Sequence, residues 1–280
     1  MNKTRFQLFL IAATCLLLPA LGFSQNIKRT TIKTERADLG AGGSVSIIGA
    51  PKGSISIEAW SKPEVEVTAE IKLEAVSEAD LALLAKVNSF VFDEDMNHIH
   101  VLTTGTHDKV FLKKNFKKLP KNLLDLPWSI DYKIKVPNYC DIDVDAGRGT
   151  FDLRGVEGSI MIKALESEKA TLDLVGGDVQ ATFGGDEVNV KLKSRSWRGH
   201  GVEIQVAKGA LNVNAPANLN ADLDLSVLRT GKIENNFQNL KPRDKTKFSE
   251  TTMTARAGVG GPKLKFTIGD GTLRFAPPKS

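Results

Sequence analysis

Acidic side chains are one group in this 280-residue chain whose spacing could support chemistry. Asp141, Asp143 and Asp145 alternate along one face of an expected strand, and stacked carboxylates could hold calcium. The calcium-binding nonapeptide repeat needs a third glycine and a nine-residue spacing. The Gly-Gly-Asp turns at residues 176–178 and 184–186 have two glycines and recur after eight residues. We therefore interpret the acids as a solvated strand face that discourages edge pairing.

Histidines offer a second arrangement that could bind a metal. His98 and His100 would share one strand face, and His107 follows shortly after. Two imidazoles at positions i and i+2 can bind a transition metal, but no Cys, Asp or Glu arrangement supplies a clear third ligand. We interpret these histidines, and His200, as surface or half-buried residues. We predict no metal site.

Signatures of catalysis are missing from the sequence. It contains no nucleophile elbow, no zinc-protease helix and no phosphate-binding loop. A carboxylate pair for glycoside cleavage cannot be assigned in an Asp-rich chain without geometry. We predict that the protein is not an enzyme and uses no cofactor.

Residues 109–128 combine lysines with bulky apolar residues and are the segment most suggestive of binding. Its lysines are Lys109, Lys113, Lys114, Lys117, Lys118 and Lys121. Such a segment could lie at a membrane surface or bind an anionic glycan such as lipopolysaccharide. In the alternative interpretation, its apolar residues cap the end of a repeat array and its lysines point into solvent, because repeat arrays need capped ends.

Three tryptophans are the aromatic residues best suited to sugars. Trp60, Trp128 and Trp197 could each stack on a sugar ring, although tryptophans in turns more often fill corners of a core. Aromatic residues make up 6% of the chain, and this scarcity weighs against a sugar-binding groove.

The N-terminus has the pattern of a secretory signal peptide. Two basic residues precede an apolar stretch, and Gly22 and Ser24 are small residues suited to cleavage before Gln25. The alternative is a lipoprotein signal at Cys15, but that cysteine lies inside the apolar stretch. We predict that residues 1–24 are removed and that the protein is exported to the periplasm, the cell surface or the medium.

The remaining chain has a mild charge and one cysteine. Its formal charge falls from +5 to about +3 when residues 1–24 are removed, which does not favour a nucleic-acid partner. Cys140 alone would remain, so that stability must come from burial and backbone hydrogen bonds and not from an intramolecular disulfide. No other stretch has the length of a transmembrane helix, and we expect the mature protein to be soluble.

Short alternating segments recur through residues 139–235 and organise the predicted fold. Apolar pairs begin nine residues apart at positions 142, 151 and 160. Glycines lie between them, where turns need φ > 0. This pattern predicts an all-β fold, either a β-solenoid or a closely related repetitive sheet of short strands.

Longer strands precede the repeats. Residues 44–136 contain the opening strands, among them a long alternating strand over residues 65–73 and a hairpin over residues 89–103. One short helix is predicted near residues 77–88, because apolar residues there have helical spacing and Ser77 is a good N-cap.

The end of the chain carries a charged segment and two more strands. Residues 236–250 are weakly patterned and are expected on the surface. The closing strands lie within residues 262–276, where Gly269-Asp270-Gly271 predicts a tight turn between two strands. We predict one elongated domain over residues 25–280.

Several segments carry a resemblance to a bacterial family. They are residues 43–47, residues 53–60, Val136-Pro137 followed by residues 141–144, Gly155-Val156-Glu157-Gly158, and Gly176-Gly177-Asp178-Val179. Together they resemble the putative-adhesin family of exported, auto-transporter-adhesin-like β-solenoid domains, over roughly residues 40–275. Residues 165–169 lack the family's glycine turn, and residues 109–128 have no counterpart. The resemblance implies export and a solenoid, and it brings no catalytic residues.

These observations together predict an exported, non-enzymatic, adhesin-like β-solenoid that presents a surface to envelope, glycan or protein partners. The lysines of residues 109–121 are the candidate anionic-surface site. Two alternatives stay open: a polysaccharide-active enzyme on a β-solenoid scaffold, and a purely structural envelope component.

Overall fold

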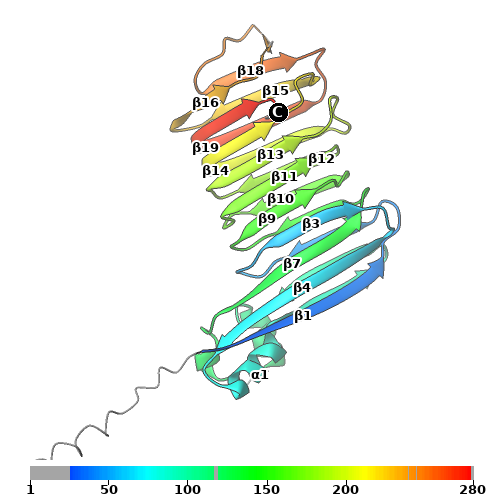
Figure 1. Ribbon diagram of the computed structural model, residues 1–280, viewed down its shortest axis with the longest axis vertical. Coiled ribbons are helices and arrows are strands. Elements are labelled where there is room, and N and C mark those ends of the chain that lie inside the picture. Colours follow the sequence, from blue (N-terminus) through cyan, green and yellow to red (C-terminus); the bar gives the residue numbers. More distant parts are fainter. Residues whose placement is uncertain (1–25, 117–118, 239, 244, 279–280) are drawn as a thin grey trace, which may run out of the picture.

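The computed structural model describes residues 26–116, 119–238, 240–243 and 245–278. The predicted signal peptide, residues 1–24, lies outside the described residues, as do Lys117 and Lys118. The described chain is mostly β-strand, which confirms the predicted class, and it is elongated, with its helices gathered at one end (Figure 1). None of the described helices has the length and apolar character needed to cross a membrane.

Hydrogen bonding connects the strands into one continuous 19-stranded sheet. In chain order the strands are β1 (Ile27–Asp38), β2 (Ser44–Ile48), β3 (Ile55–Trp60), β4 (Glu64–Ala75), β5 (Ser89–Asp95), β6 (His98–Thr104), β7 (Trp128–Pro137), β8 (Asp141–Asp145), β9 (Thr150–Arg154), β10 (Ser159–Ala164), β11 (Lys169–Leu174), β12 (Asp178–Phe183), β13 (Glu187–Leu192), β14 (Gly201–Asn214), β15 (Ala221–Val227), β16 (Gly231–Asn235), β17 (Lys241–Pro242), β18 (Thr252–Ala257) and β19 (Lys263–Ala276). The helices are α1 (Glu78–Val87), α2 (Lys109–Asn115) and the short 3-10 helix η1 (Lys121–Leu123).

The middle of the chain forms two parallel ladders that successive strands enter alternately. β8, β10 and β12 pair in the first ladder, and β9, β11 and β13 pair in the second. Ile142 lies beside Ile160, and Ile160 lies beside Val179. The nine-residue spacing of the sequence is therefore half of the structural repeat, because residues nine apart belong to different ladders.

The core lies between the two ladders. Along each strand the apolar residues point inward and the polar ones outward, as in β8, where Ile142 and Val144 are buried between exposed aspartates. Phe151 of β9 and Phe183 of β12 come from opposite ladders, and their ring centroids lie 6.4 Å apart. Burying each such side chain stabilises the fold by about 1.5–3 kcal/mol.

The opening strands extend both ladders toward the helices. β2 pairs in parallel with β8 and with β6, while β3 pairs in parallel with β9 and with β7. β4 lies antiparallel to β7 and carries β1 on its other edge. The predicted hairpin is confirmed, since β5 and β6 pair antiparallel around Met96 and Asn97, which have positive φ.

The prediction of one helix is correct in place and wrong in number. α1 begins after Ser77, whose hydroxyl accepts a hydrogen bond from the backbone N–H of Asp80 at 3.1 Å. A second helix, α2, lies within the lysine-rich segment. Asp108 caps it by accepting hydrogen bonds from the N–H groups of Val110 and Phe111, both at 2.9 Å.

The predicted tight turn at residues 269–271 is wrong. β19 runs continuously through these residues and pairs in parallel with β14 over its whole length. Likewise, β14 runs unbroken through Gly209, with Val202, Ile204 and Val206 buried before this glycine and Leu211 and Val213 buried after it. Gly209 (φ +111°) and Gly271 (φ +131°) bend these strands from one ladder into the other, so that the glycines serve a bend and not a reversal.

The charged segment after β16 is largely exposed, as expected, and leads to a strand that the sequence did not predict. β18 pairs antiparallel with β15 and buries Met253, Ala255 and Ala257. Its small alanines give a weak apolar pattern. β15 in turn lies parallel to β19 at the end of the array.

Candidate functional site

The end of the molecule that carries the helices is built from two different kinds of helix. α1 buries Leu81, Leu84 and Val87 against the sheet. α2 has no buried residue, and its aromatic Phe111 contacts Phe116 just after the helix, with ring centroids 5.6 Å apart. α2 is therefore a surface element, whose residues can meet a partner without unfolding the core.

The predicted lysine site lies on this surface. Lys109, Lys113, Lys114 and Lys121 are exposed, and the described residues provide none of them with an ion pair. Lys86 of α1 is also exposed and has no described ion pair. Four of the six predicted lysines can thus be placed.

Lysines on the ladders have a different environment. Lys163 lies 3.4 Å from the carboxylate of Asp145, and Lys265 lies 2.8 Å from that of Glu203. Lys191 and Lys193 both lie near Asp173. Several ladder lysines are therefore paired with carboxylates from rung to rung, whereas the four described lysines of residues 109–121 have no such partner among the described residues and are available to an external anion.

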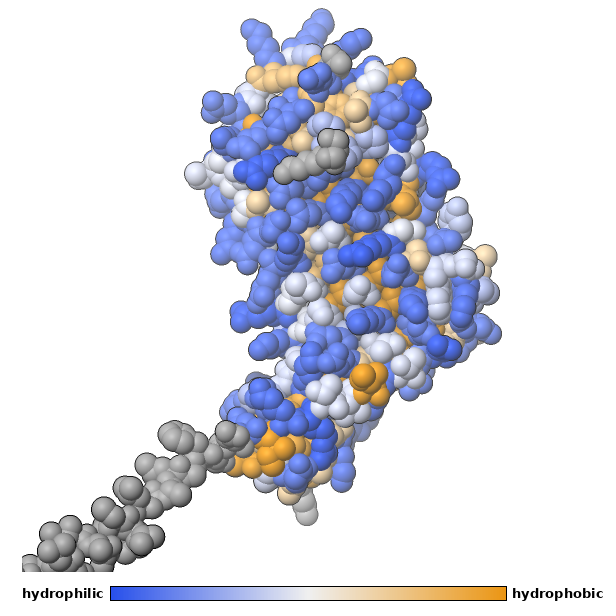
Figure 2. Space-filling model, viewed as in Figure 1, coloured by the Kyte–Doolittle hydropathy of each residue, from blue (hydrophilic) through white to orange (hydrophobic). Residues whose placement is uncertain are grey.

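A hollow opens beside these lysines, between α1 and the segment after α2. Its volume is about 650 Å³, and it is lined by Leu83, Lys86, Lys114, Asn115, Phe116, Leu119 and Pro120. Figure 2 shows apolar surface at the end of the molecule where α1 lies. The hollow therefore joins apolar walls to two ammonium groups, with no carboxylate among the lining residues.

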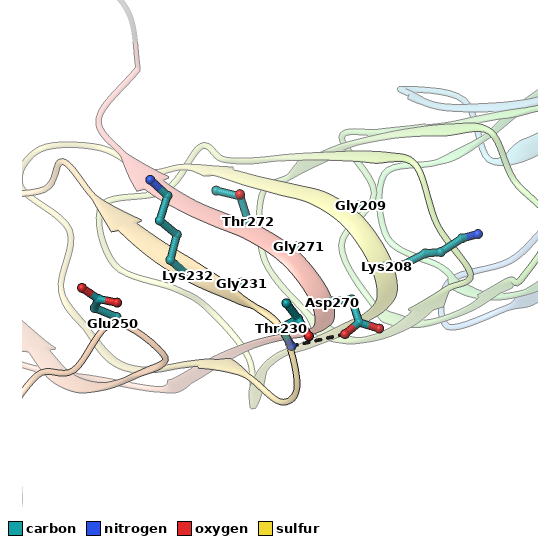
Figure 3. A pocket seen from close by; sticks show the side chains of 9 residues that line it. All are labelled: Lys208, Gly209, Thr230, Gly231, Lys232, Glu250, Asp270, Gly271 and Thr272. Carbon is teal, nitrogen blue, oxygen red and sulfur yellow. Dashed lines mark hydrogen bonds between the residues drawn. The ribbon is translucent and has the colours of Figure 1, made fainter.

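A second depression lies near the other end, over the bends of β14, β16 and β19 (Figure 3). It has a volume of about 660 Å³ and a floor of glycines. Its side chains spread apart in Figure 3, and Lys208 points away from Lys232. Asp270 pairs with Arg229 at 2.6 Å, and Lys232 pairs with Glu234 at 2.9 Å. Its polar side chains point apart and its described lining contains no aromatic residue. This depression is therefore a weaker candidate for a binding site than the hollow beside α1.

Two of the three acids on the exposed face of β8, Asp141 and Asp145, make contacts with the neighbouring strand β10. Asp141 accepts a hydrogen bond from the N–H of Ser159 at 2.7 Å, which ties one rung to the next. In the part of the chain that the structure describes, no group of three or more His, Cys, Asp or Glu side chains could hold a metal ion. These contacts favour the interpretation of a solvated face.

The histidines lie close together but have other partners. The rings of His98 and His100 have centroids 4.0 Å apart, and His98 hydrogen-bonds to Ser44 and Ser46. His107 packs against Trp128, and burial lowers its pKa although the neighbouring Asp108 opposes this effect.

The tryptophans are mostly occupied by contacts within the chain. Trp197 is 5% exposed and donates a hydrogen bond to the carbonyl of Gly177 at 2.9 Å. Trp60 is half-buried, and the ammonium groups of Lys62 and Lys135 lie 4.6 and 5.1 Å from its ring. Corner-filling is therefore the role of Trp197.

Every carboxyl group of the described chain with a shifted pKa has a lowered one, which favours its ionised form. A hydrogen bond from Lys265 lowers the pKa of Glu203, and one from Arg274 lowers that of Glu234. The others with a lowered pKa are Glu66, Asp131, Glu187, Asp222 and Asp270. A general acid for glycoside cleavage requires the opposite shift.

Comparisons with known proteins give only distant structural likenesses. No family model matches the sequence, and no curated protein matches it. A putative cell adhesion protein from Clostridium sporogenes is 10% identical, with a TM-score of 0.46 over 89% of this chain and 100% of that chain. A putative adhesin from Bacteroides fragilis is also 10% identical, with a TM-score of 0.26 over 88% of this chain and 97% of that chain. Such low similarity supports no transfer of function.

Proposed function

We propose that this chain is an exported, non-enzymatic, adhesin-like protein that binds an anionic envelope surface through its helical end. The observation that carries this proposal is the contrast between the two sets of lysines. On the ladders, Lys163, Lys169, Lys191 and Lys265 have carboxylate partners on adjacent rungs, whereas Lys133 and Lys208 have no ion pair with a described residue. At the helical end, Lys109, Lys113, Lys114 and Lys121 are exposed and have no ion pair with a described residue.

The pairing of the strands supports a β-solenoid as the scaffold. Each pair of strands completes one circuit of both ladders, with Ile142, Ile160 and Val179 stacked in successive circuits. Such an array is rigid along its axis, because each circuit is hydrogen-bonded to the next. A rigid array would hold the helical end at a fixed distance from whatever anchors its other end.

The charges of the carboxyl groups support a binding role over catalysis. A polysaccharide-active enzyme would need one carboxyl group kept protonated near neutral pH. The shifted carboxyl groups, such as Glu203 and Asp270, have lowered pKa values because cationic side chains donate hydrogen bonds to them.

The predicted signal peptide gives the export part of the proposal its own test. Secretion in a Gram-negative host should release a protein whose mass corresponds to a mature N-terminus at Gln25. A product that keeps residues 1–24 and stays in the cytoplasm would contradict export.

The binding part is tested by sedimentation with anionic vesicles or lipopolysaccharide at two salt concentrations. A variant with Lys109, Lys113, Lys114 and Lys121 changed to Gln is compared with one in which four ladder lysines are changed to Gln. The ladder set is Lys163, Lys169, Lys191 and Lys193, so that both variants lose the same charge.

Each lysine near an anionic surface contributes about 1 kcal/mol, so the loss of four lysines should weaken the binding of the helical-end variant by up to roughly a thousandfold. High salt should weaken the wild type as well. Full binding by the helical-end variant, or an equal loss in both variants, would overturn the proposal.

A further inference from the structure

We propose that the hollow lined by Leu83 and Lys86 of α1 and by residues 114–116, 119 and 120 holds the alkyl chain of a single-chain anionic amphiphile, with Lys86 and Lys114 at its head group. The inference rests on the proposed function in one respect, since the same surface attracts the anion. It adds a specific ligand class and a specific cavity.

The walls of the hollow are apolar and open to water. Leu83 is 36% exposed, although it lies on the same helix as the fully buried Leu81 and Leu84. Phe116 and Leu119 are partly exposed, and Pro120 is exposed. An apolar ligand in the hollow would remove these side chains from water, and burial of that apolar surface would favour binding.

The size of the hollow suits a small ligand. Its volume of about 650 Å³ falls within the usual range of ligand pockets, about 300–1,000 Å³. The hollow is open on one side, so a linear chain can enter from solvent while its charged end stays in water.

The polar side chains that line the hollow supply mainly positive charge to a ligand and few directional hydrogen bonds. Asn115 already donates its side-chain amide to the carbonyl of Phe111 at 3.0 Å. Among the described lining side chains, the strongest remaining polar groups are the ammonium groups of Lys86 and Lys114, for which the described residues supply no ion pair; Asn115 keeps its amide oxygen and one N–H. A ligand that fits these walls therefore combines an anionic head with an apolar body that needs no hydrogen bonds.

This combination distinguishes the proposed ligand from a glycan. A polysaccharide would bring many hydroxyl groups that the apolar walls of Leu83, Phe116 and Leu119 leave unsatisfied. An alkyl phosphate or a fatty acid leaves no such group unpaired.

The test is calorimetry of the purified protein with inorganic phosphate and with decyl phosphate and octyl phosphate, the two amphiphiles being kept below their micelle-forming concentrations. Each methylene buried in the hollow should raise the affinity by about fourfold. Decyl phosphate, with two more methylenes, should therefore bind about fifteenfold more tightly than octyl phosphate, and inorganic phosphate should bind weakly.

Two variants locate the ligand. Leu83→Asp places a carboxylate in the apolar wall and should reduce binding of decyl phosphate at least tenfold, whereas the control Val259→Asp, at a position 85% exposed, should not. Lys86→Gln with Lys114→Gln should reduce binding of decyl phosphate and remove its salt dependence, whereas Lys245→Gln with Lys247→Gln should not. Circular dichroism establishes that each variant is folded.

The outcomes separate this inference from the proposed function. Equal affinity for octyl and decyl phosphate, or wild-type affinity in folded Leu83→Asp, overturns the inference. If anionic vesicles still bind in that case, the proposed function stands. If neither alkyl phosphates nor vesicles bind, both fail. Binding of a neutral decyl glucoside as tightly as decyl phosphate overturns the role of the two lysines.

Discussion

Gly271 is a position where one added methyl group should disturb both ladders. It bends β19 with φ +131°, a conformation that residues with a side chain rarely adopt. A Cβ at Gly271 would lie 1.9 Å from the carbonyl oxygen of Gly209. On its other side, a Cβ at Gly231 would lie 1.8 Å from the carbonyl oxygen of Gly271. The three glycines form a close-packed column of backbone, visible in Figure 3.

The cost of Gly271→Ala has two parts. Holding alanine in a region of backbone space suited to glycine costs about 1–3 kcal/mol. Separating the overlapping backbones shifts strands that are hydrogen-bonded on both sides, and overpacking of this kind costs about 1–3 kcal/mol more. The free energy of unfolding should therefore fall by about 2–6 kcal/mol, a large part of the roughly 5–15 kcal/mol of a typical domain.

Thermal and urea unfolding, followed by circular dichroism, measure this change. The melting temperature should fall by roughly 5–20 °C, because 1 kcal/mol corresponds to about 2–4 °C in a domain of this size. Gly42→Ala is the matched control: it also has positive φ, but no atom lies within 4 Å of the added Cβ. Its cost should stay near about 1–2 kcal/mol. Equal stability of the two variants would show that the close approach of the Gly271 and Gly209 backbones does not limit stability.

Three further predictions concern single side chains. Burial alone would raise the pKa of Asp131, but hydrogen bonds from Lys72 and Ser54 outweigh it and leave the pKa lowered. Asp131→Asn should therefore lower the free energy of unfolding by about 1–3 kcal/mol at pH 7. In urea unfolding, this difference from wild type should persist above about pH 4 and vanish as the pH falls through the lowered pKa that Asp131 has in the folded protein. Burial raises the pKa of Cys140 to about 12, so its thiol should stay unreactive toward a disulfide reagent at pH 8 until denaturant is added; rapid reaction of the native protein would contradict this burial. Trp197→Ala should cost about 3–5 kcal/mol in urea unfolding, because the indole is buried and hydrogen-bonded; a change below about 1 kcal/mol would show that this corner is not packed.

Local sequence pattern was sufficient for elements with strong alternation or a clear cap. Ser77 and the apolar spacing after it correctly predicted α1. α2 was missed because Val110, Phe111 and Leu112 are consecutive and give no helical period, and its cap, Asp108, was not recognised. β18 was missed because its inward residues are mainly small alanines.

Other features depend on pairing between strands that are far apart in the sequence, and local patterns could not predict them. The Gly-Asp-Gly segment at residues 269–271 is locally typical of a turn, and only the partner strand β14 determines that the chain bends instead of reversing. The same holds for the candidate site. The lysines of residues 109–121 were evident from composition, whereas Leu83 and Lys86 join them only through the placement of α1 beside the segment after α2.

Hydrogen–deuterium exchange with and without anionic vesicles tests most directly the claim that the helical end is the binding surface. If this end binds the surface, exchange should slow in α1 and α2 on binding and stay unchanged in the ladder strands β8 to β13. Slower exchange along those ladder strands, with α1 and α2 unaffected, would contradict the claim.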